Sequence, residues 1–310
     1  MDKAMLPGDS SMAGWLAIRF RAVRAFSLPV SVLPVAVATA AVLPVSQWNW
    51  PVLIAAMLAA GLLHCAGNLF NDYFDFRNGV DRSLEGNDDR PGLVLVRKLM
   101  TPRQVAAEGG FCMVAVGVLA AYIVWACRPW GVNLLWFALA GAVSLYIYTG
   151  PPLALKYHAM GELLIFVTFG PLLLVGAAYA QTGRLELAAL LASAPVGLAT
   201  TAILVGNNIR DKEEDRSSGI VTLSQVIGHG RLRAVYVALV VSSVLGLAGM
   251  AAFGLMPRVL VGAPVLLVLA AKPLTAVLRD RRLSDIDART AKFETAMLLA
   301  MIAAMVADKW

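Results

Sequence analysis

Long apolar runs recur along the whole chain, and they limit its possible folds more than any other feature. A helix needs about 20 apolar residues to cross the ~30 Å hydrocarbon layer of a membrane. Hydrophobic residues make up 59% of the chain and charged residues 15%, far from the balance of a soluble domain. Runs of about the required length occupy residues 26–47, 50–70, 104–127, 131–148, 160–180, 186–206, 232–254, 257–278 and 293–308. The sequence therefore predicts an all-α, polytopic bundle of about nine transmembrane helices, in a single domain over residues 1–310.

The basic residues are distributed unevenly between the two sides of these runs. One side would hold the N-terminus and every segment after an even-numbered run, with all but four of the 26 Lys and Arg residues. Such an excess is typical of cytoplasmic loops, so we expect residues 1–25 and these loops in the cytoplasm, and the protein in a bacterial inner membrane. Arg19, Arg21 and Arg24 stand where a cleavable signal peptide would have its apolar core. Topology also explains the net charge of +6 without a nucleic-acid partner.

Acidic residues gather at two places on that same side. The stretch NLFNDYFDFRNGVD, residues 68–81, follows the second apolar run, and GNNIRDKEEDRSSG, residues 206–219, follows the sixth. Residues spaced i, i+4 and i+7 or i+8 share one face of a helix. Each stretch contains such a set: Asn68, Asp72 and Asp75 in the first, and Asn207, Asp211 and Asp215 in the second. Two such faces, directed at each other, would form an anionic pocket at the cytoplasmic mouth of the bundle.

These paired sets indicate a metal site. We interpret the remaining loop carboxylates, such as Glu85 and Glu213, as solvated side chains. The two sets crowd carboxylates onto helix ends without an equal number of cations nearby in the sequence, so they would repel one another unless a cation is bound. Mg²⁺ takes oxygen ligands and bridges carboxylates to substrate phosphates. The pattern therefore predicts Mg²⁺ and a phosphorylated substrate.

Five segments of the chain, in order and spacing, resemble the UbiA superfamily of intramembrane prenyltransferases. The two acidic stretches stand where that family has its Asp-rich signatures, after the second and sixth membrane helices. RAVRAFSLP resembles the basic entry to the first helix, DRPGLVLVRKLMTP the lid after the first signature, and YTGPPLALKYHAMGELLIF the loop with its Tyr and Lys. The resemblance implies a helical bundle around a central cavity, capped by loops on the cytoplasmic side.

The resemblance also implies the roles of individual residues. A polyprenyl diphosphate would bind through Mg²⁺, ionise to an allylic cation and alkylate an aromatic acceptor, with its tail in a slot open to the lipid bilayer. The expected metal ligands are Asn68, Asp72, Asp75, Asp81, Asn207, Asp211 and Asp215. The expected diphosphate contacts are Arg24, Arg97, Lys98, Lys156, Arg210 and Asn208. We expect Asp72, Asp75, Asp211, Asp215, Tyr148 and Lys156 to be needed for catalysis.

Three further polar residues each have a functional and a structural interpretation. His64 lies one turn before Asn68 and could contact substrate, or it could be a hydrogen-bonded packing residue. Tyr148 could contact substrate or serve as an interfacial anchor. Glu162 could polarise an acceptor hydroxyl or stabilise a helix N-terminus.

Several functions stay open at this level. NDYFDFRNGVD and NNIRDKEEDRSSG look closest to the branch that contains 1,4-dihydroxy-2-naphthoate polyprenyltransferase of menaquinone synthesis, although Ile220 stands where that branch usually has a basic residue. The acceptor could instead be another aromatic, such as 4-hydroxybenzoate. A terpene cyclase of the same superfamily would use the same metal cluster without an acceptor. A transporter is disfavoured, because both acidic faces lie on one side of the membrane.

Overall fold

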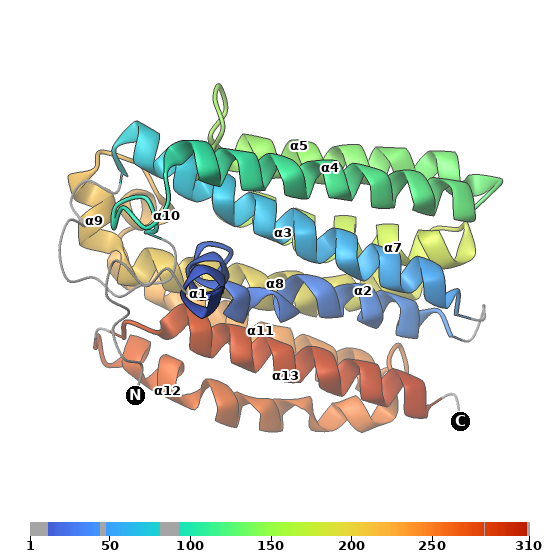
Figure 1. Cartoon of the computed structure of the whole chain (residues 1–310). Coiled ribbons are helices and arrows are strands. Elements are labelled where there is room, and N and C mark those ends of the chain that lie inside the picture. The colour runs from blue at the N-terminus through green and yellow to red at the C-terminus, as the bar shows by residue number, and fades with distance from the viewer. Residues whose placement is uncertain (1–11, 44–47, 81–92, 282, 309–310) are drawn as a thin grey trace.

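The computed structural model describes residues 12–43, 48–80, 93–281 and 283–308, and within them it is almost entirely helical (Figure 1). Eight helical segments in these ranges are long and apolar enough to cross a membrane. They are α3 (Trp50–Asn78), α4 (Pro102–Ala126), η3 with α5 (Trp130–Thr149), α6, η5 and α7 (Gly161–Thr182), α8 (Leu187–Arg210), α11 (His229–Ala252), η6 with α12 (Arg258–Leu278) and α13 (Ile286–Ala307). A bent pair, α1 (Met12–Ala22) and Ala25–Ala41, which comprises η1 and α2 (Pro29–Ala41), forms a ninth candidate. The predicted all-α membrane bundle is confirmed.

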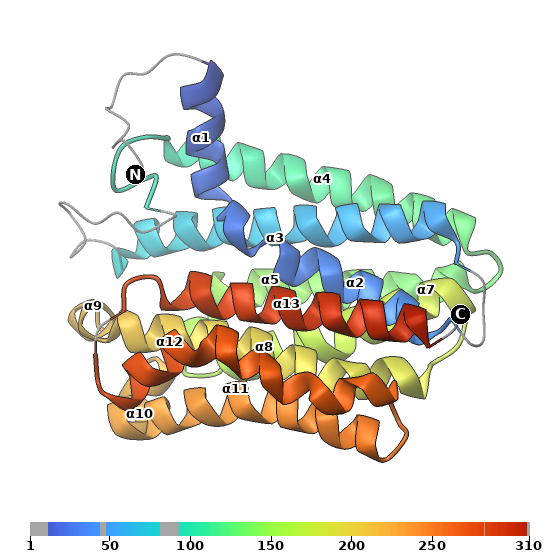
Figure 2. The ribbon, with the colours of Figure 1, turned by 90° about the horizontal axis from the view of Figure 1, so that it is seen from below.

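The long helices lie side by side along one direction (Figures 1 and 2). Helix α1 departs from this arrangement and runs across the bundle (Figure 2), because the chain bends by 56° between α1 and the segment that contains α2. The short helices η4 (Leu155–Tyr157), α9 (Lys212–Ser217) and α10 (Leu223–Ile227) connect long helices. Helices α9 and α10 lie together at one end of the bundle (Figure 1). That end also carries the last turns of α3 and α8.

Three helices extend beyond the apolar runs that predicted them. Helix α3 begins behind an Asn49 cap and continues to Asn78, where Gly79 ends it in the left-handed conformation. Helix α8 continues to Arg210, and α13 begins at Ile286 rather than near residue 293. The hydrophobic pattern underestimates the length of these helices, because their last or first turns carry the polar residues of the site. The acidic stretches therefore lie largely on helix ends and not in loops.

Helix α8 is the most buried of the long helices. Small residues make this possible, because they allow helix backbones to approach closely within a membrane. A Cβ atom on Gly197 would lie 3.0 Å from the Phe166 carbonyl oxygen, and one on Gly170 would lie 2.9 Å from the Ser193 carbonyl oxygen. Gly170 belongs to η5 (Thr168–Leu172), a π-helical turn that also contains Pro171. This break in the fifth span packs directly on α8.

A carboxyl group that the sequence analysis did not single out lies in the core of the bundle. Glu294 of α13 is fully buried, and a hydrogen bond of 2.6 Å joins its Oε1 atom to Thr200 Oγ1 of α8. Among the described residues no cation pairs with Glu294, and its Oε2 atom has no hydrogen-bond partner. A buried carboxyl without a cation is far more stable in its neutral form. Glu294 therefore joins α13 to α8 as an uncharged acid.

We expect substitutions of Glu294 to affect stability according to charge. Glu294→Gln keeps the volume and the neutral hydrogen bond, so its free energy of unfolding should change by less than about 1 kcal/mol. Glu294→Lys places an unpaired cation in the same core position and should cost about 3–5 kcal/mol. Thermal unfolding in detergent micelles measures both. A Lys variant as stable as the Gln variant would contradict the neutral assignment.

Candidate active site

One cavity of about 460 Å³ brings the ends of α3 and α8 together. Its polar end is lined by side chains from both acidic stretches: Asn68, Asn71 and Asp75 from the first, and Asn207, Asn208, Asp211 and Asp215 from the second. Arg24, Tyr148, Lys156 and Arg210 line the same cavity. The rest of its wall is mostly apolar. Residues from four separate segments of the sequence therefore meet at one site.

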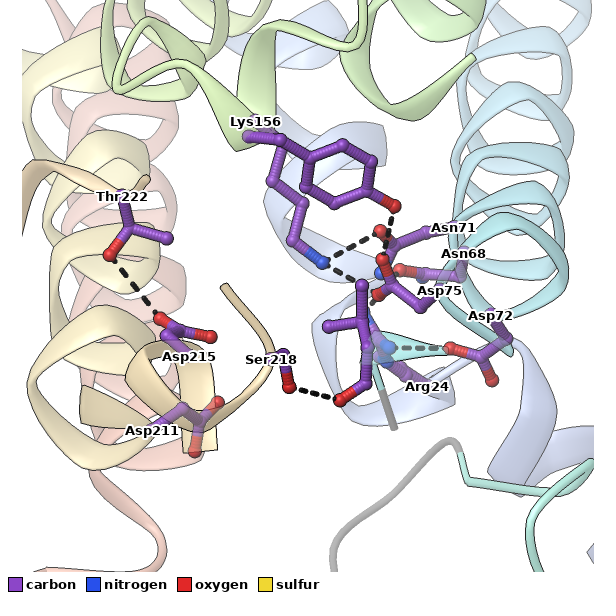
Figure 3. Close-up of polar contacts among 12 residues, drawn as sticks. Arg24, Asn68, Asn71, Asp72, Asp75, Lys156, Asp211, Asp215, Ser218 and Thr222 are labelled. Carbon is purple, nitrogen blue, oxygen red and sulfur yellow. Dashed lines mark hydrogen bonds and ion pairs between the residues drawn. The ribbon is translucent and has the colours of Figure 1, made fainter. Parts of the chain in front are cut away.

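Asp75 is the centre of the contacts on the α3 side (Figure 3). Its Oδ2 atom lies 2.6 Å from Lys156 Nζ, and its Oδ1 atom accepts a 2.6 Å hydrogen bond from the Tyr157 hydroxyl. Lys156 Nζ also donates to Asn71 Oδ1 at 3.0 Å. Burial lowers the pKa of Lys156, but Asp75 and two tyrosines outweigh it, so the net pKa lies above its ordinary value. Lys156 is therefore a fixed cation.

Asp72 lies apart from this group. Its Oδ1 atom is 2.6 Å from Arg24 Nη2, and Arg24 Nη1 donates to Asn68 Oδ1 at 3.2 Å. Figure 3 shows Asp211 and Asp215 at one side of the site and Asp72 at the other, beyond Arg24. Asp72 is not among the described residues that line the cavity. Asp72 is thus directed toward Arg24 at the entry of the first span, and its part in holding a metal stays a prediction.

The α8 side is organised by Arg210. Its Nε and Nη2 atoms contact the two Asp211 carboxylate oxygens at 2.6 and 2.8 Å, and its Nη1 atom lies 2.8 Å from Asp287 Oδ2 of α13. Asp215 is held at Oδ2 by a 3.3 Å hydrogen bond from the Thr222 hydroxyl. Burial raises the pKa of Asp215 to about 7, against an opposing effect of Lys156. A cation bound near Asp215 would favour its ionised form.

The sequence argument that these carboxylates lack nearby cations is wrong. Asp72 pairs with Arg24, Asp75 with Lys156, and Asp211 with Arg210. Two of the three cations lie 48 and 81 residues from their partners, so only the fold brings them together. The expected repulsion is already offset by the protein's own charges. These three carboxylates are thus paired without a metal, whereas Asp215 has no salt bridge among the described residues.

The donor atoms nevertheless fit a hard divalent cation. Carboxylate and amide oxygens are the ligands that Mg²⁺ prefers. Asn207 Oδ1, in the cavity lining, is a buried oxygen without a hydrogen-bond partner among the described residues. The described residues contain no ready cluster of three His, Cys, Asp or Glu side chains around one point. Asp81, a predicted ligand, lies outside the described residues.

The remaining predicted residues fall into three groups. His64 lines the cavity, but its two ring nitrogens contact Ser27 Oγ at 2.9 Å and Ser31 Oγ at 2.5 Å, which is the packing alternative. Glu162 Oε1 accepts a 2.6 Å hydrogen bond from Asn208 Nδ2 and so joins α6 to α8. Neither Arg97 nor Lys98 is among the described residues that line the cavity.

Asn71, Tyr157 and Asp287 were missed by the sequence analysis. Asn71 lies within NLFNDYFD, but the set selected there was the one at i, i+4 and i+7 that contains Asp72, so Asn71 was left out. Tyr157 directly follows Lys156 in the sequence. Asp287 lies in the polar first turn of α13, ahead of the apolar run that predicted this helix.

A family model decides the classification of the chain. The model of the UbiA prenyltransferase family matches residues 31–302. The chain belongs to the UbiA prenyltransferase family. The family resemblance noted in the sequence is thereby confirmed.

Curated relatives of this UbiA family member include two proteins named UbiA prenyltransferase domain-containing protein 1. The one from Xenopus tropicalis is 38% identical over 212 residues, which cover 67% of this chain and 59% of the relative. The one from Homo sapiens is 36% identical over 209 residues, covering 67% and 60%. The chain thus spans about three-fifths of the length of these relatives.

Solved structures of UbiA homologues from Archaeoglobus fulgidus share the fold. One, described as bound to GPP and Mg²⁺, has a TM-score of 0.67 at 14% identity and covers 94% of this chain and 99% of its own. Another, described as bound to DMAPP and Mg²⁺, has a TM-score of 0.65 at 15% identity, with coverages of 93% and 99%. At this identity the likeness establishes the fold.

Proposed function

We propose that this protein transfers a polyprenyl group from its diphosphate to an aromatic acceptor, with Mg²⁺ as cofactor. The observation that carries the proposal is the single cavity, which joins a cluster of carboxylates, amides and cations to a long apolar slot. A polyprenyl diphosphate has the same division between a highly charged end and an apolar tail. The diphosphate would lie among the polar residues and the tail would follow the slot. Two homologues of the same fold are described as binding GPP or DMAPP with Mg²⁺.

The polar end offers two kinds of contact to a diphosphate. Arg24 and Lys156 line the cavity and are cationic, so they can donate charge-assisted hydrogen bonds to phosphate oxygens. Bound Mg²⁺ would neutralise diphosphate charge and so make it a better leaving group. Asp75, Asn207, Asp211 and Asp215 are the residues we assign to holding it. Lys156 and Arg210 must then loosen their present pairs with Asp75 and Asp211.

The transfer follows from that neutralisation. The allylic C–O bond breaks, its electron pair leaves with the diphosphate, and the resulting carbocation alkylates an electron-rich ring carbon. The ring then loses the proton from that carbon to the departed diphosphate and becomes aromatic again. The apolar slot excludes water, which protects the cation from premature hydrolysis. In our assignment, Asp75 helps to hold the metal and Lys156 contacts the phosphate oxygens of the leaving group.

We propose a 1,4-dihydroxy-2-naphthoate-like acceptor, with 4-hydroxybenzoate as the alternative. The support is the form of the two acidic stretches, NDYFDFRNGVD and NNIRDKEEDRSSG. The asymmetry of basic residues supports a cavity mouth on the cytoplasmic face of the membrane. The curated relatives compared above come from animals, so they lend no support to a bacterial inner membrane.

A transfer assay tests the proposal. The purified protein in lipid nanodiscs is supplied with radiolabelled geranylgeranyl diphosphate and Mg²⁺, with dihydroxynaphthoate, with hydroxybenzoate, or with no acceptor. We expect a labelled prenylated aromatic only when an acceptor is present. A labelled hydrocarbon or alcohol formed without acceptor would favour the cyclase instead. No consumption of any prenyl diphosphate would overturn the proposal.

The slot predicts a dependence on tail length. Ala177 of α7 lines the cavity and lies far along the fifth span from Gly161, the residue that starts this span near the polar end. Ala177→Phe should shorten the slot, so the ratio of kcat/KM for geranylgeranyl over geranyl diphosphate should fall by about tenfold or more. Leu190→Phe is the control, because Leu190 is 49% exposed on the outer surface of α8. An unchanged ratio in Ala177→Phe would place the tail elsewhere.

A further inference from the structure

The chain breaks sharply at Arg24. Arg24 has φ 52° and ψ 54°, the left-handed conformation, between α1 and η1 (Ala25–Ser27). For a residue other than glycine this conformation costs about 1–2 kcal/mol, so surrounding contacts must hold it. The break separates α1 from the first span and directs the Arg24 side chain into the cavity. The position of the guanidinium therefore depends on what stabilises this backbone.

A chain of hydrogen bonds through Ser27 of η1, His64 of α3 and Ser31 of α2 holds the break. The Ser27 hydroxyl donates a 2.8 Å hydrogen bond to the Arg24 carbonyl oxygen. A serine hydroxyl has one proton, so Ser27 Oγ must accept its 2.9 Å hydrogen bond from His64 Nε2. His64 Nδ1 then accepts the 2.5 Å hydrogen bond from Ser31 Oγ. The pattern assigns His64 as a neutral imidazole that carries its proton on Nε2.

The guanidinium end of Arg24 is fixed by the same helix. Arg24 contacts Asn68 and Asp72, which lie one and two turns after His64 on α3. Asn68 Nδ2 donates in turn to the Val23 carbonyl oxygen at 2.9 Å. Helix α3 thus holds Arg24 both at its backbone and at its guanidinium. At the Arg24 carbonyl, the α3 side chain that acts through Ser27 is His64.

We propose that His64 is a positioning residue, which acts through Ser27 to hold Arg24 at the break and so sets the Arg24 guanidinium where it meets the substrate diphosphate. The proposal rests on the proposed function, because it gives Arg24 a diphosphate to bind. It also replaces the expectation that His64 itself binds substrate, since Ser27 and Ser31 occupy both ring nitrogens. Asp72 belongs to the same arrangement as the anchor of the guanidinium, which explains its place outside the cavity lining.

Binding of geranyl S-thiolodiphosphate, measured by isothermal titration in nanodiscs with Mg²⁺, tests this inference. His64→Leu removes both hydrogen bonds and should weaken binding about tenfold, because a cation displaced by about 1 Å loses much of its contact. His64→Gln keeps one donor and one acceptor and should bind within about threefold of the wild type. Tyr179→Phe is the control, since it removes another side-chain hydrogen bond, to Asn133, at the opposite end of the fifth span from Gly161 and outside the cavity lining. It should bind normally.

A double-mutant cycle separates positioning from general loosening of the bundle. In an Arg24→Gln background, His64→Leu should cause no further loss of binding, because the residue through which it acts is absent. Equal and additive losses in both backgrounds would overturn the proposal. So would a His64→Gln variant as weak as His64→Leu. Failure of the wild type itself to bind the thiolodiphosphate would instead overturn the proposed function.

Discussion

Asp75→Asn should lower kcat/KM for prenyl transfer by at least about a thousandfold, with the protein still folded. Asp75 is 6% exposed, lines the cavity, and is the carboxylate to which Lys156 and Tyr157 both bind. The substitution removes the charge while the side chain keeps its shape, so little packing is lost. Removing one preorganised electrostatic contact commonly costs about 10²–10³ in rate, and here the metal and Lys156 would both lose a partner.

Asp72→Asn is the matched comparison for this prediction. Asp72 lies three residues earlier on the same helix, is equally buried and also pairs with a cation. Because it contacts Arg24 and does not line the cavity, its loss should cost only about tenfold to a hundredfold. Steady-state kinetics with circular dichroism for folding measures both variants. If Asp72→Asn is inactive while Asp75→Asn retains most activity, our assignment of the two residues is reversed.

Lys156→Met should destabilise the protein by about 3–5 kcal/mol and also abolish transfer. The variant leaves the buried Asp75 carboxylate without its cation, and an unpaired buried charge is expensive. The double variant Asp75→Asn/Lys156→Met removes both charges. It should recover most of the stability, because no buried charge is left without a partner. It should recover none of the activity, because transfer needs both charged groups.

Chemical and thermal unfolding of the two single variants and the double variant gives the coupling free energy of this pair. Lys212→Met is the control, because Lys212 pairs with Glu213 at 3.3 Å on the exposed surface. Exposed pairs contribute about 0–1 kcal/mol, so this variant should be as stable as the wild type. A double variant no more stable than Lys156→Met would show that Lys156 contributes through packing and not through its charge.

The sequence by itself determined the membrane bundle, the two acidic stretches and their place at one end of the bundle. These features are local or follow from a count along the chain. An apolar run of about 20 residues is long enough to span the membrane whatever its neighbours are, and residues at i and i+4 share a face in any helix. Asn68, Asp75, Asn207, Asp211, Asp215 and Lys156 could therefore all be selected, and the structure places all of them in one cavity.

Only the tertiary structure decided how these residues are paired. Asp72 and Asp75 are about 300° apart around a helix of 3.6 residues per turn, so they are 60° apart on its surface. That difference sends one carboxylate to Arg24 and the other to Lys156 and the cavity. Sequence spacing could not show which cation each carboxylate meets. The side chain's neighbours are defined only after α1, η4 and α13 have packed around α3 and α8. The partner of a buried charge is set by which helices become neighbours, and that depends on the packing of the whole bundle.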